Sequence, residues 1–332
     1  MRAVGRTGVH VSELGFGAAS IGNLYKVVPD EDAAAVVEAA WESGVRYFDT
    51  APHYGLGLAE RRLGAVLAGH PRGEFTVSTK VGRLIVPNPA GEGGRDLDNG
   101  FDVPATLRRQ WDFTGTGVRR SLEESLQRLG LDRVEIALIH DPEESDQPET
   151  ALTEGYAALH ELRSAGVVGA VGVGSKQVQI LQRFVTETEI DTIMLAGRYT
   201  LLEQPALDEL LPACEKHGVS VLNVGVFNSG LLARDWPADD GHYEYGTAPR
   251  ELVERARRIA AVCREHGTTL PHAALVFAGA HPTVASVVVG AGRPAHMQRN
   301  ADLAAAPPPP AALWADLVAQ GLLRPDAPVP TS

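Results

Sequence analysis

Short runs of β-branched and aromatic residues alternate with amphipathic segments along most of the chain. The apolar runs predict strands at 9–16, 45–48, 75–79, 134–139, 167–173, 192–195, 219–224 and 284–289. The segments between them have apolar residues at helical spacing, and they predict helices at 31–43, 58–67, 118–129, 150–164, 176–186, 205–217 and 249–266. Strands and helices therefore alternate as they do in an α/β protein.

This alternation predicts a (β/α)8 TIM barrel, in which eight parallel strands close on themselves. An open, doubly wound sheet has the same alternation and is the alternative. We expect residues 1–332 to form a single domain, because no break in composition divides the chain. Residues 83–115, rich in Pro and Gly, are expected to form an irregular insert loop with a functional role. Residues 304–332 are expected to form a proline-rich spacer, a short helix at 311–320 and a tail.

Composition excludes several classes of function. Thirty basic residues against 42 acidic residues leave a net charge of −12, which argues against nucleic acid as a partner. The chain has two cysteines, Cys214 and Cys263, which excludes a disulfide scaffold and fits a reducing compartment. The N-terminus has no apolar signal core and no apolar run approaches ~18 residues, so we expect no membrane partner and a cytoplasmic location.

Ionisable side chains stand at the ends of three predicted strands. These are Asp49, Lys80 and His140, and Tyr54 lies in the loop after the first of the three strands. The carboxyl ends of barrel strands share one rim, so we expect the four side chains to converge there. The Lys80 cation can lower the pKa of the Tyr54 phenol, and Asp49 can serve as the counter-ion of Lys80. His140 can orient a substrate oxygen. Taken singly, each could instead be a solvated loop residue.

Other kinds of site have weaker support. The segment 15–20 resembles a dinucleotide-binding turn but lacks its third glycine. His53, His140 and Asp49 could approach a metal ion, but their spacing matches no metal-ligand motif, so no metal site is predicted. A serine hydrolase motif, G-x-S-x-G, is absent.

Two glycine-containing turns follow the last two predicted strands, at 228–230 and 290–292. Barrel enzymes commonly bind phosphate with the loops at these positions, close to the N-terminus of a short helix that could here begin at Pro294. Two ordinary turns are the alternative.

Longer motifs resemble those of a known family. Residues 47–55, continued by Glu60 and 63–64, resemble the first signature of the aldo-keto reductase superfamily, and residues 121–132 resemble its second. Further segments resemble the D-threo-aldose 1-dehydrogenase branch, which includes L-fucose and L-galactose dehydrogenases and pyridoxal 4-dehydrogenase; they are 79–83, 111–113, 139–142, 195–200 and 227–232. The resemblance extends over about residues 4–303.

The resemblance implies a barrel that uses NAD or NADP without a Rossmann domain. It also implies a catalytic tetrad of Asp49, Tyr54, Lys80 and His140, the same set that the strand ends indicate. The cofactor-binding positions that it implies are Gly17, Ser175, Phe227, Asn228, Ser229, Gly230, Leu232, Gly290, Ala291, His296 and Asn300. His53 and Trp111 are the expected substrate-pocket residues.

One departure from the family pattern bears on the cofactor. NADPH-dependent members carry a Lys-Ser pair and a later Arg for the 2′-phosphate, where this chain has Gly290, Ala291 and His296. We therefore expect NAD as the cofactor and NADP less well, unless Arg293 or Arg299 compensates. The expected reaction is oxidation of the anomeric carbon of an aldose of the L-fucose, L-galactose or D-arabinose type to a lactone. The alternatives are a pyridoxal 4-dehydrogenase, a general aldehyde or ketone reductase, and a non-catalytic cofactor-sensing subunit.

Overall fold

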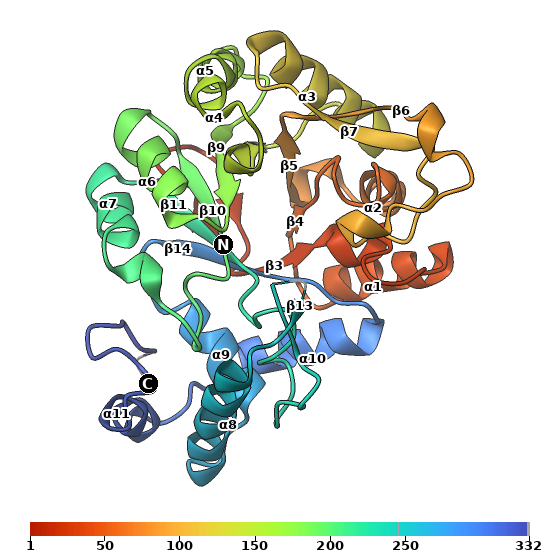
Figure 1. Ribbon diagram of the computed structural model, residues 1–332. Helices are drawn as coiled ribbons and strands as arrows, with labels where there is room; N and C mark the ends of the chain where they lie inside the picture. The colour runs from red at the N-terminus through yellow and green to blue at the C-terminus, as the bar shows by residue number, and fades with distance from the viewer. Residues whose placement is uncertain (245, 331–332) are drawn as a thin grey trace.

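Parallel strands close into a barrel in the computed structural model of the chain, which describes residues 1–244 and 246–330 (Figure 1). In chain order they are β3 (Leu14–Gly17), β4 (Tyr47–Asp49), β5 (Thr76–Val81), β8 (Ile136–His140), β9 (Ala170–Ser175), β10 (Thr192–Ala196), β11 (Ser220–Val224) and β14 (Val284–Val289). Each strand pairs with the next in this order, and β14 pairs with β3 to close the ring. The predicted (β/α)8 fold is therefore confirmed, and the open sheet is excluded.

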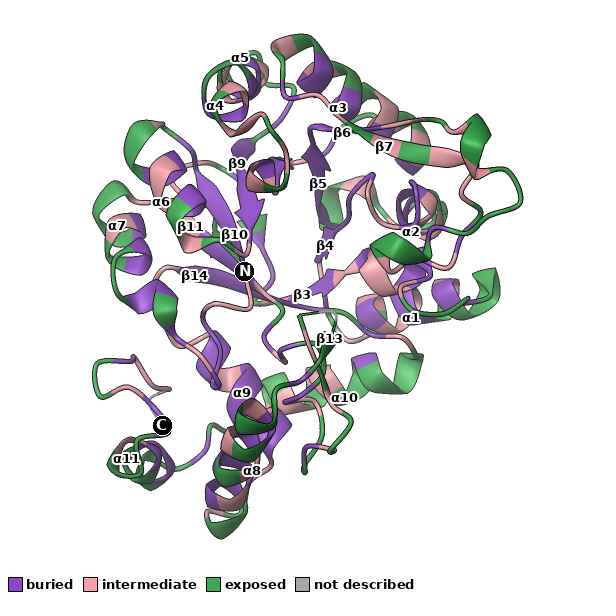
Figure 2. Cartoon of the chain, viewed as in Figure 1, coloured by how far each residue is buried: buried purple, intermediate pink, exposed green. Residues whose placement is uncertain are grey.

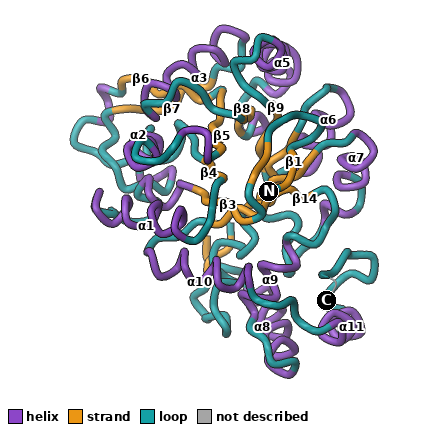
Figure 3. The backbone as a smooth tube through the Cα atoms, turned by 180° about the vertical axis from the view of Figure 1, so that it is seen from behind, coloured by secondary structure: helices purple, strands orange, loops and turns teal. Residues whose placement is uncertain are grey.

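Helices surround the strands on the outside, as the view from behind also shows (Figure 3). The helices are α1 (Asp30–Glu42), α2 (Leu58–Leu67), α3 (Gly115–Leu129), α4 (Pro148–Thr150), α5 (Tyr156–Ser164), α6 (Val178–Glu187), α7 (Leu210–His217), α8 (Arg250–Glu265), α9 (Leu270–Ala278), α10 (Pro294–Ala305) and α11 (Ala311–Ala319). A π-helical turn at Ala151–Gly155 joins α4 to α5, and 3₁₀ turns occur at Ala18–Gly22, Arg72–Glu74, Pro89–Gly91, Leu97–Asn99, Pro142–Glu144 and Pro205–Leu207.

Both faces of the barrel strands are buried, whereas most of the helices expose their outer faces (Figure 2). A small apolar cluster fills the inside of the barrel and includes Tyr47, Leu138 and Leu222. A much larger cluster lies between the strands and the helices. Strands buried on two sides need nearly continuous apolar sequence, which is why β14 reads Val-Ala-Ser-Val-Val-Val.

The N-terminal segment differs from the prediction of one strand over 9–16. A short antiparallel pair, β1 (Arg2–Ala3) and β2 (His10–Val11), precedes β3. Ser12 separates β2 from β3, because its hydroxyl donates to the Leu14 carbonyl at 2.7 Å and accepts from the Arg46 amide at 3.0 Å. Val9 and Val11 belong to the inner apolar cluster, so this hairpin closes the amino-terminal end of the barrel.

The insert at 83–115 is not wholly irregular, which corrects the prediction. It contains an antiparallel hairpin of β6 (Arg83–Pro87) and β7 (Leu107–Trp111), with Arg83 opposite Trp111. The burial of β7 alternates residue by residue, and Arg109 and Trp111 are on its more buried face. Because β7 has polar or cationic residues on both faces, it contains no apolar run from which a strand would be predicted.

Helix α9 was not predicted, for a related reason. Its residues are apolar except for His272, and most are buried, so the segment shows no helical alternation of polar and apolar positions. The predicted C-terminal helix is present as α11, after the prolines at 307–310, while 331–332 lie outside the described residues. A second short hairpin, β12 (His242–Tyr243) and β13 (Gly246–Thr247), lies in the loop before α8. Within the described part of the chain, no helix is long and apolar enough to cross a bilayer.

The packing of α2 against α3 depends on Gly64, and this can be tested by Gly64→Ala. Alanine favours a helix by about 1 kcal/mol over glycine, but its Cβ would lie only 1.8 Å from the Leu129 carbonyl oxygen. The backbone of one helix would have to move, so we expect a net loss of about 1–2 kcal/mol in the free energy of unfolding, measured with urea. Gly73→Ala, where nothing lies within 4 Å, is the control. Equal stability of the two variants would contradict the close contact.

Candidate active site

The four side chains expected to carry the chemistry lie together at the carboxyl end of the barrel. Asp49 ends β4, Lys80 lies near the end of β5, His140 ends β8, and Tyr54 is in the loop after β4. All four line one cavity of about 650 Å³. They meet because β4, β5 and β8 are neighbours in the strand order.

A buried ion pair joins Lys80 to Asp49. The ammonium lies 2.8 Å from Oδ1 and 2.7 Å from Oδ2 of Asp49, and it donates to the Thr50 carbonyl at 3.0 Å. Ser78 donates a further hydrogen bond to Asp49 at 2.7 Å. Burial acts to lower the pKa of Lys80, but the Asp49 carboxylate and Tyr54 outweigh it and raise that pKa above its ordinary value. Lys80 is therefore a cation at neutral pH.

The Tyr54 ring lies beside this ammonium and close to the imidazole of His140. Lys80 Nζ is 4.9 Å from the centre of the Tyr54 ring, and a side-chain hydrogen bond with Tyr54 is among the interactions that raise the pKa of Lys80. The His140 and Tyr54 ring centres are 6.0 Å apart, with the rings nearly perpendicular at 88°. Phe101 packs against Tyr54 at 6.1 Å. The phenol is thus next to a cation that stabilises its deprotonated form.

His140 is held in its neutral form. Burial, followed by the positive charges of Arg83 and Lys80, lowers its pKa well below the ordinary value. Its Nε2 lies 3.2 Å from Asp141 Oδ2 at the rim of the same cavity. A neutral imidazole has one N–H donor, so His140 can hydrogen-bond a substrate oxygen without adding charge.

The two expected substrate residues have different positions. His53 lines the cavity, and its ring centre is 5.7 Å from that of His140. Trp111 does not line it, which corrects the expectation. The Arg83 guanidinium lies 4.2 Å above the Trp111 ring and is itself part of the cavity wall, so Trp111 supports Arg83 from behind.

The sequence reasoning missed an ionic cluster on this wall. Arg83 forms ion pairs with Asp141 and with Glu144. Burial raises the pKa of Asp141 to about 7, against the opposing effect of Arg83. Asp141 directly follows His140, and both Asp141 and Arg83 lie in segments that resemble the D-threo-aldose 1-dehydrogenase branch. Neither signal indicated the ion pair, because Arg83 and its partners are more than fifty residues apart in the chain.

A second cavity of about 500 Å³ adjoins the first one. Both are lined by Ala19, Leu24, Tyr25, Lys176, Ala196, Gly225, Val288 and Gly290, so they form one continuous groove. Of the expected cofactor residues, Gly17 and Ser175 line the first cavity, Gly290 lines both, and Phe227, Asn228, Ser229, Gly230 and Ala291 line the second.

The donor set of this groove fits a nicotinamide dinucleotide. Asn228, Ser229 and Gly230 have positive φ angles of 46°, 57° and 94°. The amides of Asn228 and Gly230 donate to the Gly225 and Phe227 carbonyls, which leaves the Ser229 amide without a partner among the described residues and available to a phosphate. Asn228 Oδ1 is buried and has no hydrogen-bond partner within the described residues, so it is available to a ligand donor. The small residues Gly290 and Ala291 leave room on the opposite wall.

Three expected cofactor residues do not line the groove. Leu232 is fully buried in the large apolar cluster, where its side chain serves packing. His296 and Asn300 lie on α10, beyond the walls of both cavities. The Ser175 hydroxyl is already engaged, since it donates to Glu143 and accepts from the Gln177 amide at 2.8 Å.

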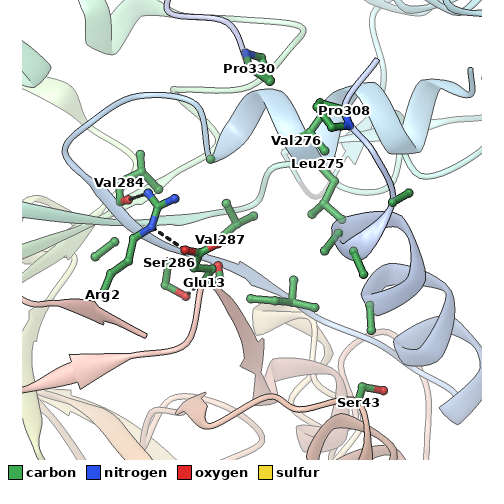
Figure 4. A pocket seen from close by; sticks show the side chains of 17 residues that line it. Arg2, Glu13, Ser43, Leu275, Val276, Val284, Ser286, Val287, Pro308 and Pro330 are labelled. Carbon is green, nitrogen blue, oxygen red and sulfur yellow. Dashed lines mark hydrogen bonds and ion pairs between the residues drawn. The ribbon is translucent and has the colours of Figure 1, made fainter. Parts of the chain in front are cut away.

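A hollow at the other end of the barrel lacks this chemistry. A cavity of about 420 Å³ lies at the opposite, amino-terminal ends of β3 and β14, between Arg2, Leu275 and Pro308 (Figure 4). Its walls are mainly apolar, and they include none of the four clustered residues. Across residues 1–244 and 246–330, no three His, Cys, Asp or Glu side chains are grouped so as to hold a metal ion.

Comparison with known proteins agrees with this geometry. The aldo/keto reductase family model matches residues 13–315. The chain is 52% identical over 322 residues to D-threo-aldose 1-dehydrogenase of Pseudomonas sp, covering 97% of each chain. It is 38% identical over 313 residues to pyridoxal 4-dehydrogenase of Microbacterium luteolum, covering 90% of this chain and 91% of the relative.

Solved structures give the same result. An aldo-keto reductase from Bacillus halodurans, in its holo form, superposes with a TM-score of 0.73 at 27% identity, covering 100% of this chain and 98% of the other. Members of the family use a nicotinamide cofactor, which the groove described above can accommodate. From its sequence match, its barrel and its close relatives, the chain belongs to the aldo/keto reductase family of oxidoreductases.

Proposed function

We propose that the protein is an aldose 1-dehydrogenase that oxidises the anomeric carbon of a sugar to a lactone, with NAD as its preferred cofactor. The observation that carries the proposal is the Asp49–Lys80 ion pair against the Tyr54 ring, in a cavity that forms one groove with the second cavity. Similarity to D-threo-aldose 1-dehydrogenase over nearly all of both chains supports the substrate class.

Oxidation of an anomeric hydroxyl removes a proton from the oxygen and a hydride from the carbon. Tyr54, as a phenolate, accepts the proton. Lys80 stabilises that phenolate, and Asp49 keeps Lys80 charged in a buried position. The nicotinamide, when bound, supplies the hydride acceptor. The carbon gains a double bond to its former hydroxyl oxygen and keeps its ring oxygen, so the product is a lactone.

His140 orients the sugar for this step. As a neutral donor it can bind the anomeric oxygen and hold it towards Tyr54, at the point where the two rings approach each other. It can also stabilise negative charge on that oxygen as the proton leaves. The same arrangement serves carbonyl reduction, in which His140 donates a hydrogen bond to the carbonyl oxygen and Tyr54 gives that oxygen a proton.

The preference for NAD follows from the residues near α10. His296 is largely exposed there, and partial desolvation, followed by the charges of Arg293, Lys26 and Arg299, lowers its pKa. Arg299 is already paired with Asp235 at 2.7 Å. Arg293 and Lys26 then remain to bind the 2′-phosphate of NADP. They are a weaker set of ligands than the Lys-Ser pair and Arg of NADPH-dependent members. NADP is therefore proposed as the second, poorer cofactor.

The substrate class can be tested with a panel. Purified protein with NAD⁺ is expected to form NADH with L-fucose, L-galactose or D-arabinose. Failure with all three sugars, together with fast reduction of small aldehydes by NADPH, would identify a reductase instead. Oxidation of pyridoxal would favour the activity of the second relative. Cofactor binding without any turnover would indicate a non-catalytic subunit.

The role of Tyr54 can be tested by Tyr54→Phe. Loss of the acid–base hydroxyl is expected to lower kcat by about 10²–10⁴-fold, while the Kd of the cofactor stays within about twofold. Steady-state kinetics and fluorescence titration measure the two quantities. Tyr156→Phe on α5, whose hydroxyl only accepts from the Glu189 amide, is the matched control. Retention of turnover in Tyr54→Phe would overturn the proton-transfer role.

The cofactor preference can be tested by Arg293→Ala. A charge-assisted contact to the added phosphate of NADP⁺ is lost, so kcat/KM for NADP⁺ is expected to fall about tenfold. The value for NAD⁺ should change less than about twofold, because NAD⁺ has no such phosphate. Arg250→Ala, an exposed site on α8, is the control. An equal fall with both cofactors would contradict a specific contact.

A further inference from the structure

The ring of His53 is held by two arginines from the insert. Arg109 Nε lies 2.6 Å and Arg83 Nη1 lies 3.2 Å from His53 Nδ1. A third contact runs from Arg109 Nη2 to the His53 carbonyl oxygen at 2.7 Å. Arg109 is itself anchored, because its Nη1 lies 2.7 Å from the carboxylate of Asp96. The side chains of Arg109 and Asp96 are each only 9% exposed, so water competes little for these contacts.

These contacts determine where the imidazole carries its proton. A guanidinium has only N–H donors and cannot accept a hydrogen bond. Nδ1 must therefore offer a lone pair to Arg109 and Arg83, and the single ring proton lies on Nε2.

The surroundings also keep the His53 ring uncharged. Burial comes first, and the positive charges of Arg83, Arg109 and Lys80 then lower the pKa of His53 well below its ordinary value. The other titratable groups facing the ring are His140 and Tyr54, whose ring centres lie 5.7 Å and 5.9 Å away. No carboxylate is among the groups that shift this pKa, so none opposes the cations.

We propose that Arg109 is a positioning residue, which, anchored by Asp96, holds His53 as an Nε2–H donor to a substrate oxygen in the cavity. This rests on the proposed function, since a sugar supplies hydroxyl oxygens that can accept such a bond. A substrate group at this position must be a hydrogen-bond acceptor, so a hydroxyl or carbonyl oxygen fits and an ammonium does not. The insert thereby acts on substrate choice through one imidazole.

The geometry explains why an arginine is needed. Its planar fork reaches the His53 ring nitrogen, the His53 carbonyl and the Asp96 carboxylate with three different nitrogens. A lysine, with one nitrogen, could not hold all three. The adjacent Arg108 is on the exposed face of β7, which provides a control from the same strand.

The tautomer can be measured on the protein without cofactor or substrate. Long-range ¹H–¹⁵N spectra of the uniformly ¹⁵N-labelled chain report the state of each imidazole, and the His53 signals are those lost in His53→Gln. In the wild type we expect the Nε2–H pattern, unchanged from about pH 5.5 to about pH 8. A ring protonated on Nδ1, or charged at neutral pH, would overturn the proposal without any need for an arginine variant.

Arg109→Gln tests the cause. Without the guanidinium, Nδ1 loses its shorter hydrogen bond, so the ¹⁵Nδ1 signal of His53 is expected to shift. The pKa of His53 is expected to rise, while burial and the charges of Arg83 and Lys80 still hold it below the ordinary value. Arg108→Gln should leave the spectrum as in the wild type. An unchanged His53 signal in a folded Arg109→Gln protein, checked by circular dichroism, would contradict the positioning role.

Kinetics then connect the ring to the substrate. Arg109→Gln is expected to raise KM for the sugar about tenfold with a smaller change in kcat, and His53→Gln should have a similar effect. The double variant should be no worse than either single variant, because both act through one hydrogen bond. Additive effects would overturn the coupling. If no sugar is turned over at all, the proposed function fails, while the spectra still decide the state of His53.

Discussion

The buried ion pair between Lys80 and Asp49 is the interaction on which the site depends. Removing two charges from water costs several kcal/mol per ion, so the pair is stable only if its hydrogen bonds are satisfied. Here the ammonium has three acceptor contacts, and Ser78 supplies a further donor to the carboxylate. The pairing of Asp49 with Ser78 between β4 and β5 sets this geometry. The barrel thus places Lys80, a cation at neutral pH, beside Tyr54.

Three cations act on the site of an acidic chain. The net charge is −12, yet Lys80 and Arg83 line the cavity, and Arg109 contacts the ring of His53 in its wall. Each of these cations is paired with a carboxylate. Lys80 stabilises a phenolate on Tyr54, while burial, followed by the charges of the cations, keeps both imidazoles neutral.

Prediction from sequence succeeded where local pattern carries the information. Apolar runs identified the barrel strands, and the positions directly after them identified Asp49, Lys80 and His140. It failed where no alternating pattern exists: α9 is apolar except for His272, and β7 has charged residues on both of its faces. Trp111 was expected in the pocket because it lies in segment 111–113, which resembles the D-threo-aldose 1-dehydrogenase branch. The pairing of β6 with β7 instead places Arg83 between Trp111 and the cavity.

The sequence alone determined the alternation of strands and helices, and with it the residues that reach the carboxyl rim, because these depend on spacing along the chain. Only the tertiary structure decided what those residues contact. The pairing of Arg109 with His53 and Asp96, and the union of two cavities into one groove, join segments distant in the chain. Such contacts depend on how loops fold over the rim, and loop conformation is set by packing rather than by any repeating pattern.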